Sequence, residues 1–369
     1  MHLLTTSREA LLAPLQSVAG IVEKRHTLPI LSNVLIEKRG EELTLLATDI
    51  EIQIRTTTTG DLGGGDDTCI TVAARKLQDI LRALPDGTEV NLTLDDSRMT
   101  VRAGKSRFAL QTLPAADYPR MALPDDSSTR FSISQKAFKR QLAQVAYSMA
   151  QQDIRYYLNG LLLIADENEL RMVATDGHRL AFATTPLENP AARSDVILPR
   201  KTVLELARQL ADTDDELEVI LAGNQAVFRF GPTELVTKLI DGRFPDYERV
   251  IPQDHPHSVI LPHGPLHAAL SRVAILTNEK FRGVRLVLGD GVLRIQSSNT
   301  EQEEAHEELE IDSHGAQVDI GFNVTYLLDV LNNTDATTIE WHFNDANSSA
   351  LLTVPGNEHF KYVVMPMRI

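Results

Sequence analysis

One short frame recurs through this chain of 369 residues and constrains its fold more than any other feature. The frame is an apolar strand that ends in a polar turn, and it occupies Leu45–Glu51, Val173–Phe182 and, more faintly, Leu293–Thr300. Asp49 and Asp176 lie 127 positions apart, and Asp176 and Asn299 lie 123 apart. Because even spacing at about a third of the chain is typical of repeated units, the sequence predicts three copies of one domain.

Each copy is itself double, with an amphipathic helix followed by three strands, twice over. The helical period is clearest in residues 10–22, where Leu11, Leu15, Val18 and Val22 form an apolar stripe. We expect helices at 10–22, 73–84, 135–149, 201–210, 266–276 and 324–331. We expect strands at 30–37, 43–47, 51–57, 89–94, 99–103, 108–112, 158–164, 170–175, 178–184, 217–221, 225–230, 234–239, 284–288, 292–297, 303–311, 339–343, 350–354 and 362–366. This order predicts an α+β fold with domains at 1–127, 128–252 and 253–369.

Composition points to the cytoplasm. No apolar run approaches the roughly 20 residues that a membrane-spanning helix needs, and residues 1–9 lack the basic and then apolar pattern of a leader. The single cysteine, Cys69, excludes an intramolecular disulfide, which fits a reducing compartment. Since Cys69 opens an apolar strand, we expect its side chain to be buried.

The formal net charge of −15 argues against a protein that coats itself in nucleic acid, but the basic residues are not spread evenly. They concentrate on the predicted helices and their entries, at Lys24, Arg25, Arg75, Lys76, Arg82, Lys136, Lys139, Arg140, Arg200, Lys201, Arg208 and Arg272. Bases on equivalent elements of successive repeats indicate one shared basic surface. Solvated helix faces are the alternative. The last helix breaks the pattern with Asp329 and no base.

Acidic residues are densest at Glu301–Glu308. Metal binding is conceivable there, but a run of one sign without a fixed turn is a poor cation site, so we expect no metal and no cofactor. We expect this run to meet Arg102, Lys105 and Arg107 of a second chain, because head-to-tail pairing of opposite chain ends closes a ring. The loop Gly60–Asp67 has three adjacent glycines, but no Lys-Ser/Thr helix start follows, so it predicts a mobile turn rather than a phosphate site.

Two other functions are candidates for this chain. Asp176 and His178 form a candidate acid–base pair for a hydrolase, yet no nucleophile elbow, metal spacing or phosphate loop accompanies them. The recurrence of the Thr-Asp frame at Thr48 and Asp49 favours a scaffold turn instead. The other competing function is a repeat scaffold that binds proteins without DNA, for which the basic helix residues would be dispensable.

Six motifs together resemble the bacterial DNA polymerase III β subunits, the sliding clamps, and most closely those of proteobacteria. They lie at Thr27–Leu31, Gln152–Gly160, Ala174–Leu180, Asp241–Tyr247, Asn278–Arg285 and Tyr362–Arg368, and the likeness runs from near residue 7 to the C-terminus. The resemblance implies a non-catalytic processivity subunit and a head-to-tail homodimer. Three similar clamp domains per chain would form a ring, with helices inside and antiparallel sheets outside. The ring would enclose duplex DNA without sequence specificity.

The resemblance also implies a peptide pocket for the replicative polymerase, the clamp loader and other proteins that carry a motif of the type Gln-x-x-Leu-Phe. The matching positions are Leu158, Thr175, Gly177, His178, Arg179, Leu180, Pro245, Arg249, Val250, Phe281, Asn323, Tyr326, Ser349, Val363, Val364, Met365, Pro366, Met367 and Arg368. Methionine and aliphatic side chains offer an adaptable apolar floor, while arginines and Asn323 can hold polar or C-terminal groups. Asn347 and Ile369 border the pocket and depart from the family's pattern, so they bear on peptide preference.

The same matching assigns two further surfaces. The residues expected to face DNA are Arg25, Arg75, Gln151, Gln152, Tyr156, Tyr157, Arg200 and Lys201. Tyr156 and Tyr157 are candidates for stacking on unpaired bases. An equally good alternative is that both are aromatic residues buried in the core. The residues expected at the dimer seam are Lys105, Arg107, Phe108, Leu110, Ile275, Leu276, Glu303 and Glu304.

Overall fold

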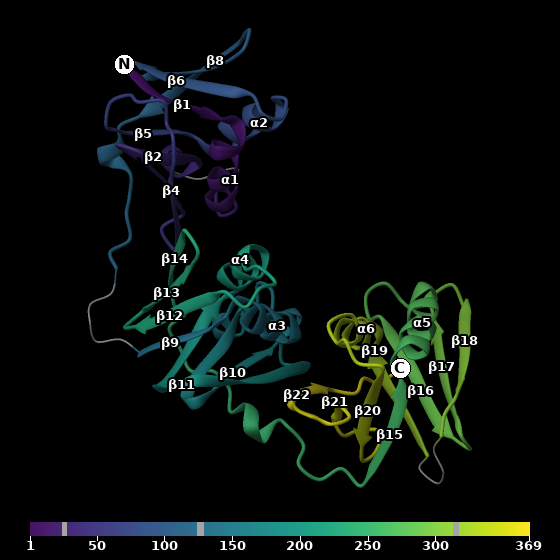
Figure 1. Cartoon of the computed structure of the whole chain (residues 1–369). Coiled ribbons are helices and arrows are strands. Elements are labelled where there is room, and N and C mark those ends of the chain that lie inside the picture. The colour runs from purple at the N-terminus through teal and green to yellow at the C-terminus, as the bar shows by residue number, and fades with distance from the viewer. Residues whose placement is uncertain (24–27, 124–128, 313–316) are drawn as a thin grey trace. The chain divides into compact units, whose positions relative to one another are not determined.

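The six predicted helices are present in the structure, a computed structural model that describes residues 1–23, 28–123, 129–312 and 317–369 (Figure 1). Their bounds are α1 Arg8–Ala19, α2 Ala74–Ala83, α3 Gln135–Val145, α4 Arg200–Gln209, α5 His263–Val273 and α6 Val324–Asn332. Helix α3 is shorter than predicted because it gives way to a 3₁₀ turn at Ala146–Ser148. Helix α5 begins and ends three residues earlier than predicted and is followed by a 3₁₀ turn at Ala274–Leu276.

The first compact unit comprises residues 1–136 and 205–239 and is built on one antiparallel sheet of twelve strands. Its order is β1-β6-β7-β8-β5-β2-β3-β4-β14-β13-β12-β9. Helices α1 and α2 pack against each other and contact strands of this sheet. The bounds are β1 His2–Ser7, β2 Asn33–Arg39, β3 Glu42–Thr48, β4 Ile52–Thr59, β5 Thr68–Ala73, β6 Glu89–Asp95, β7 Arg98–Ala103, β8 Ser106–Leu113, β9 Thr129–Ser134, β12 Glu216–Ala222, β13 Gln225–Phe230 and β14 Thr233–Lys238.

The second unit comprises residues 137–204 and 240–369 and holds two antiparallel sheets. One has the order β10-β11-β22-β21-β20-β15 and the other β18-β17-β16-β19. The bounds are β10 Gly160–Thr175, β11 Arg179–Pro199, β15 His257–Pro262, β16 Gly283–Gly289, β17 Val292–Ser298, β18 Glu304–Glu310, β19 Val318–Asn323, β20 Thr338–Phe343, β21 Ala350–Val354 and β22 Asn357–Val364.

Strands that the sequence pattern missed are β1, β9, β15 and β19, each of which leads directly into a helix. Their residues include Thr, Ser, His and Asp, so their apolar alternation is weak. The three strands predicted between 158 and 184 are in fact one long hairpin of β10 and β11, with bulges near Glu167 that absorb the polar residues between them. Pro186 and Pro190 in β11 concealed its length, because proline is uncommon inside paired strands.

One other prediction in the first unit is wrong. Cys69 is exposed rather than buried; its Sγ lies 3.8 Å from Nη2 of Arg120, and partial desolvation raises the pKa of its thiol. The loop at 60–67 contacts β1 through two backbone hydrogen bonds: Thr5 N–H donates to Leu62 O at 2.8 Å, and Asp66 N–H to His2 O at 3.2 Å.

A buried lysine secures the same loop. Lys38 is only 2% exposed, and its Nζ donates a hydrogen bond to Gly65 O at 2.9 Å. Gly65 has φ +95°, and a Cβ there would meet Leu3 O at 2.3 Å. Glycine is therefore required at this position both for backbone conformation and for the close approach to β1.

We predict that Gly65→Ala destabilises the protein by about 2 kcal/mol or more, since it adds a backbone clash to the strain of a left-handed conformation. Gly64→Ala is the matched control, because Gly64 has φ +72° but a Cβ there meets nothing within 4 Å. The control should cost only about 1 kcal/mol. Urea unfolding measures both variants, and equal losses would contradict the docking of this loop.

Candidate functional site

The turn between β10 and β11 is shaped by two side chains, Thr175 and Asp176. Thr175 Oγ1 donates to Arg179 O at 2.6 Å and accepts from Gly177 N at 3.1 Å. Asp176 Oδ1 accepts from the backbone N–H groups of His178 at 2.9 Å and Arg179 at 3.1 Å. Gly177 has φ +90°, which glycine adopts without strain. These local bonds fix the tight turn that the sequence predicted.

The first repeat forms the same turn with the equivalent residues. Thr48 Oγ1 donates to Ile52 O at 2.9 Å and accepts from Ile50 N at 3.0 Å. Asp49 Oδ1 accepts from Glu51 N at 2.9 Å and from Ile52 N at 2.8 Å. The recurrence of the frame is thus a recurrence of hydrogen bonds, and the Thr-Asp pair is a scaffold element.

This geometry is unlike that of an acid–base pair. Asp176 directs Oδ1 to the backbone N–H of His178, and its other oxygen accepts from Arg179 Nε at 3.1 Å. A general base would need its carboxylate at the imidazole ring, where it could orient the tautomer. The Asp176 carboxylate therefore serves the turn and Arg179.

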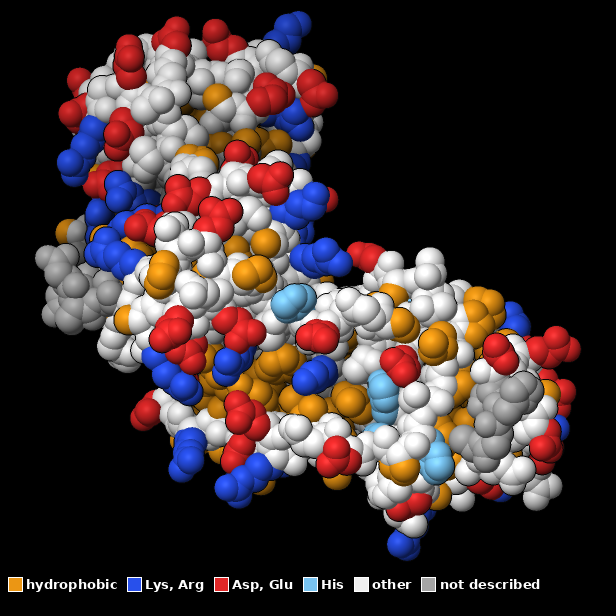
Figure 2. Space-filling model, turned by 60° about the horizontal axis from the view of Figure 1, so that its bottom comes forward, with side chains coloured by type: hydrophobic (Ala, Val, Ile, Leu, Met, Phe, Trp, Pro, Cys, Tyr) orange, Lys and Arg blue, Asp and Glu red, His pale blue; other side chains and the backbone are white. Residues whose placement is uncertain are grey.

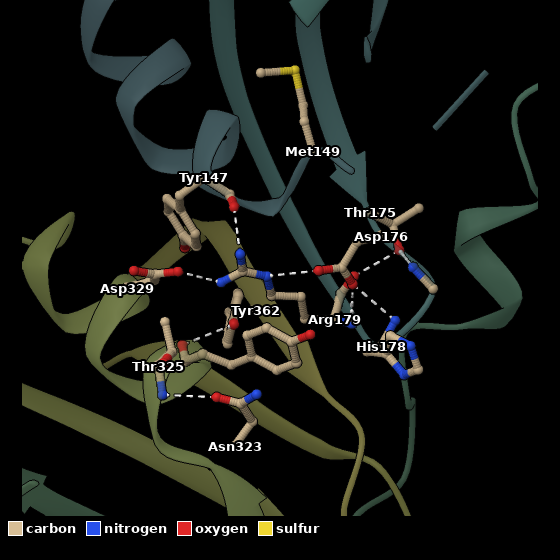
Figure 3. Close-up of polar contacts among 12 residues, drawn as sticks. Tyr147, Met149, Thr175, Asp176, His178, Arg179, Asn323, Thr325, Asp329 and Tyr362 are labelled. Atoms are coloured by element: carbon tan, nitrogen blue, oxygen red, sulfur yellow. Dashed lines mark hydrogen bonds and ion pairs between the residues drawn. The ribbon is translucent and has the colours of Figure 1, made fainter. Parts of the chain in front are cut away.

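Arg179 is the hub of the polar contacts in Figure 3. Its Nη1 donates to Asp329 Oδ2 at 2.6 Å and its Nη2 to Tyr147 O at 2.6 Å. Its guanidinium carbon lies 4.3 Å from the centre of the Tyr326 ring, and Tyr362 Oη donates to the Tyr326 carbonyl at 2.9 Å. The prediction that Arg179 holds peptide groups did not foresee these internal partners. Asp329, the acid that interrupted the basic pattern of the helices, was the available signal.

An apolar cluster lies beside the turn. Leu180 and Val363 are cross-strand partners of β11 and β22, and they pack in one buried cluster with Phe244, Tyr247 and Ile251 from the segment after β14. Beside it, a groove of about 410 Å³ is lined in part by Phe182, Tyr247, Ile251 and Lys361. Figure 2 shows apolar side chains gathered in a hollow between charged ones on one face of the molecule. The sequence had not indicated this groove along β11.

The C-terminal tail runs back across the second sheet of this unit. Met365 N–H donates to His178 O at 2.9 Å, and Met367 N–H to Gly321 O at 2.8 Å. A Cβ on Gly321 would meet Met367 O at 2.4 Å, so glycine permits this close approach. The Ile369 side chain lies over Gly283 and Gly321. The tail thereby ties the turn at His178 to β19.

All nineteen predicted pocket residues lie in the second unit, but they differ in accessibility. Buried members are Leu158, Thr175, Leu180, Val363 and Val364; partly buried ones are Arg179, Asn323, Tyr326, Ser349, Pro366 and Met367; exposed ones are Gly177, His178, Pro245, Arg249, Val250, Phe281, Met365 and Arg368. Hydrogen bonds of the turn and α6 involve Thr175, Arg179, Asn323 and Tyr326. Asn323 accepts from Thr325 N at 2.9 Å and so caps α6.

The exposed members have weaker ties. Phe281 is 58% exposed, and Lys280 Nζ lies 5.4 Å from its ring centre. Arg249 has a side chain 86% exposed and pairs with Asp246 at 2.8 Å. Exposed aromatic and arginine side chains are of the kinds that are enriched in protein interfaces.

The residues predicted to face DNA are divided between the units. Arg75 lies on α2, where it is exposed and donates to Val22 O at 2.7 Å. Gln151, Gln152, Tyr156, Tyr157, Arg200 and Lys201 lie in the second unit, and Arg25 lies outside the described residues. The tyrosines differ: Tyr156 is 59% exposed, whereas Tyr157 packs against the apolar cluster beside the turn. Their rings meet edge to face at 5.9 Å.

The residues predicted at the dimer seam lie on two strand edges and one helix end. Lys105, Arg107, Phe108 and Leu110 belong to β8 and its turn, while Glu303 and Glu304 belong to β18 and its approach, and Ile275 and Leu276 follow α5. Ile275 is 77% exposed. Part of the acidic run is used internally, because Glu307 accepts two hydrogen bonds from Arg272, at 2.6 and 2.8 Å, and Glu308 accepts one from Arg294 at 3.0 Å.

Across the described part of the chain, no group of three or more His, Cys, Asp or Glu side chains is placed to hold a metal ion. Nor do the described helices include one long and apolar enough to cross a membrane.

Comparison with known proteins accounts for this architecture. Three family models match in order: the DNA polymerase III beta subunit N-terminal domain at residues 1–122, the central domain at 132–246 and the C-terminal domain at 248–368. The chain belongs to the DNA polymerase III beta subunit family. Its fold is the three-domain clamp fold of that family.

Individual relatives agree over their full lengths. The beta sliding clamp of Pseudomonas aeruginosa is 46% identical, with 100% of each chain covered, and that of Escherichia coli K12 is 43% identical, with 99% covered. The crystal structure of the DNA polymerase III subunit beta from Pseudomonas aeruginosa superposes with a TM-score of 0.94 at 46% identity, covering 100% of both chains. A Caulobacter crescentus beta sliding clamp gives 0.94 at 38% identity, covering 100% of this chain and 99% of the other.

A second arginine, Arg155, also contacts the turn. Arg155 Nη2 donates to Asp176 O at 3.3 Å, and its guanidinium lies 3.1 Å from where a Gly177 Cβ would be. Arg155 also donates to Asp153 from Nε at 3.0 Å and from Nη2 at 2.8 Å. These side-chain hydrogen bonds lower the pKa of Asp153 to about 2.

We predict that Arg155→Gln returns the pKa of Asp153 toward its ordinary value of about 4. Because the pKa is lowered in the folded protein, the pair stabilises the fold above the ordinary pKa and is lost only as the pH falls toward about 2. Carboxyl ¹³C NMR titration measures the shift. Arg171→Gln, which removes a pair with Glu169, is the control that should leave Asp153 unchanged; an identical Asp153 titration in wild type and Arg155→Gln would contradict the assignment.

Proposed function

We propose that this chain is a sliding clamp that gives a replicative DNA polymerase its processivity and catalyses no reaction itself. The observation that carries the proposal is the ordered match of all three beta subunit family models along the chain. Its clamp domains are residues 1–127, 128–252 and 253–369. The protein works in the bacterial cytoplasm and needs neither a cofactor nor a metal.

We further propose that two copies close head to tail into a ring. Within each chain, β4 pairs with β14, with Ile52 opposite Thr237, and β11 pairs with β22, with Arg179 opposite Val364. Both residues of the second pair lie 127 positions after those of the first. By the internal repeat, the third such pair is β18 with β8. In the described residues, β18 is the edge of its sheet and β8 pairs with β5 only through its last two residues. Two unpaired edges of this kind support pairing between copies.

Side-chain chemistry supports the same seam. Phe108 and Leu110 of β8 offer apolar contacts for Ile275 and Leu276 of the other copy. Around them, Lys105 and Arg107 complement Glu303 and Glu304. An apolar centre with a charged rim is typical of specific protein interfaces. The charges would steer the two edges together and fix their register.

The ring would enclose duplex DNA, with the helices lining the hole and the sheets outside. Arg25, Arg75, Gln151, Gln152, Tyr156, Tyr157, Arg200 and Lys201 are the proposed DNA-facing residues. Arginine and lysine contacts to phosphate carry no sequence information, so the clamp can slide. The exposed ring of Tyr156 is suited to stack on an unpaired base. Tyr157, packed in the apolar cluster, supports Tyr156 rather than stacking itself.

The second unit would dock partner peptides. The replicative polymerase, the clamp loader and repair polymerases would present a Gln-x-x-Leu-Phe type of motif to the surface formed by the turn, the tail and α6. Met365, Val250 and Phe281 are exposed apolar side chains that would contact such a motif, while Leu180 and Val363 are buried in the apolar cluster. Such short motifs bind through a few apolar anchors with polar contacts around them.

We predict that loaded protein stays on nicked circular DNA and is lost when that DNA is linearised, because the link is topological. Retention measured by gel filtration before and after linearisation tests this. Equal retention on both forms that falls steeply with salt would mean ordinary electrostatic binding and would overturn the ring. If charge reversal at Lys136, Lys139 and Arg140 left retention unchanged, the result would favour a scaffold that binds proteins without DNA.

We predict that Ile275→Asp converts the dimer to monomer, because it buries a charge at an apolar seam. Sedimentation velocity measures the change. Ile260→Asp is the matched control: Ile260 is also an exposed isoleucine, at 53%, but it lies on β15, which is neither of the two proposed edge strands. A dimer that persists in Ile275→Asp, or dissociates equally in both variants, would contradict the assigned seam.

A further inference from the structure

Arg179 joins three separate segments of the second unit through one guanidinium. Nε bonds Asp176 of the β10–β11 turn at 3.1 Å, Nη1 bonds Asp329 of α6 at 2.6 Å, and Nη2 bonds the Tyr147 carbonyl after α3 at 2.6 Å (Figure 3). The planar fork of arginine suits it to such divergent acceptors, and a lysine ammonium cannot reproduce it. The side chain is only 9% exposed.

Aromatic rings complete the enclosure of this charge. The guanidinium carbon lies 4.3 Å from the ring centre of Tyr326 and 5.7 Å from that of Tyr147. Tyr147 and Tyr362 lie 5.8 Å apart, and Tyr362 in turn bonds the Tyr326 backbone. A guanidinium with three hydrogen-bonded acceptors and ring contacts is already satisfied by its own protein.

The first repeat shows that the turn itself does not need this arginine. There, Ile52 stands at the position of Arg179, yet Thr48 and Asp49 form the same four hydrogen bonds as Thr175 and Asp176. The turn therefore folds without an arginine. What Arg179 adds is the connection from the turn to Asp329 and to Tyr147.

We propose that Arg179 is a positioning residue of the peptide site and not one of its ligand-binding cations. It holds the Asp176–His178 turn in place against α6, so that the distance between the turn and α6 is already set when a peptide binds. This inference rests on the proposed peptide-docking function.

We assign the contact with a carboxylate of the peptide to Arg249, one of the exposed arginines of the predicted site. Its side chain is 86% exposed, and its partner Asp246 is itself 52% exposed. An exposed pair of this kind contributes little to stability, so Arg249 can exchange Asp246 for an incoming acid at small cost. The structure thus separates two roles that the sequence had given to both arginines together.

The first test compares two forms of a fluorescein-labelled peptide, Gln-Ala-Ala-Leu-Phe, one with a free C-terminal carboxylate and one with a C-terminal amide. Fluorescence polarisation measures both affinities. We expect Arg179→Met to weaken both forms by a similar factor, about tenfold. Arg179→Lys should behave like Arg179→Met, because it keeps the charge but not the fork. Arg249→Ala should remove the preference for the carboxylate and leave amide binding nearly unchanged.

The second test needs no peptide. In a Cys69→Ser background, nitroxides at Ile154→Cys and Thr325→Cys, both exposed positions of the second unit, report the distance between the turn side and α6 by double electron–electron resonance. Arg179→Met should broaden this distance distribution. Arg285→Met is the control, because it removes a surface pair with Asp319 and should change neither measurement.

A narrow, unchanged distribution in Arg179→Met, or a loss of affinity confined to the carboxylate peptide, would overturn the positioning role. Failure of wild-type protein to bind either peptide would contradict the docking function itself. The distance measurement would still decide whether Arg179 couples the turn to α6, so the two failures are distinguishable.

Discussion

Antiparallel pairing between strands of successive repeats is the constraint on which the rest of the structure depends. The β4–β14 and β11–β22 pairs continue a sheet from one copy of the repeat into the next, in registers displaced by 127 positions. Because side chains alternate between the two faces of a strand, a slip of one residue would turn every apolar side chain to the wrong face. Register at each junction therefore also fixes where the Thr-Asp turn lies, directly before the first paired residue.

The two junctions have the same backbone turn but different side chains. Because of those side chains, only one junction is a candidate peptide site. After the first turn come Glu51, Ile52 and Gln53; after the second come His178, Arg179 and Leu180. Arg179 gains Asp329 and Tyr147 as partners, while Leu180 joins the apolar cluster with Val363. Duplication supplied the same turn twice, and a few side chains turned one copy into a candidate peptide site.

The helices and the repeat could be predicted because both appear as periodic patterns in the amino-acid sequence. It failed where the signal is tertiary. Strands β1 and β9 are polar and gain their structure by pairing with β6 and β12. Cys69 was expected inside because its neighbours are apolar, whereas the pleat turns it outward. The partners of Arg179 lie 32 and 150 positions away, so a sequence pattern that marks Asp329 as unusual does not connect it to Arg179.

Ion pairs within the chain change the prediction that the helix bases form one basic surface. Twelve bases on helices indicated one basic surface, yet Arg208 is bound by Glu205 and Arg272 by Glu307 within the chain. An arginine paired with a carboxylate gains less from phosphate where that carboxylate is shielded from solvent, as are those of Glu205 and Glu307, with side chains only 8% and 25% exposed. Arg75 is bound differently, through the backbone carbonyl of Val22, which leaves its charge uncompensated by that contact. The field at the proposed DNA surface thus depends less on how many bases the helices carry than on which of them lack a carboxylate partner.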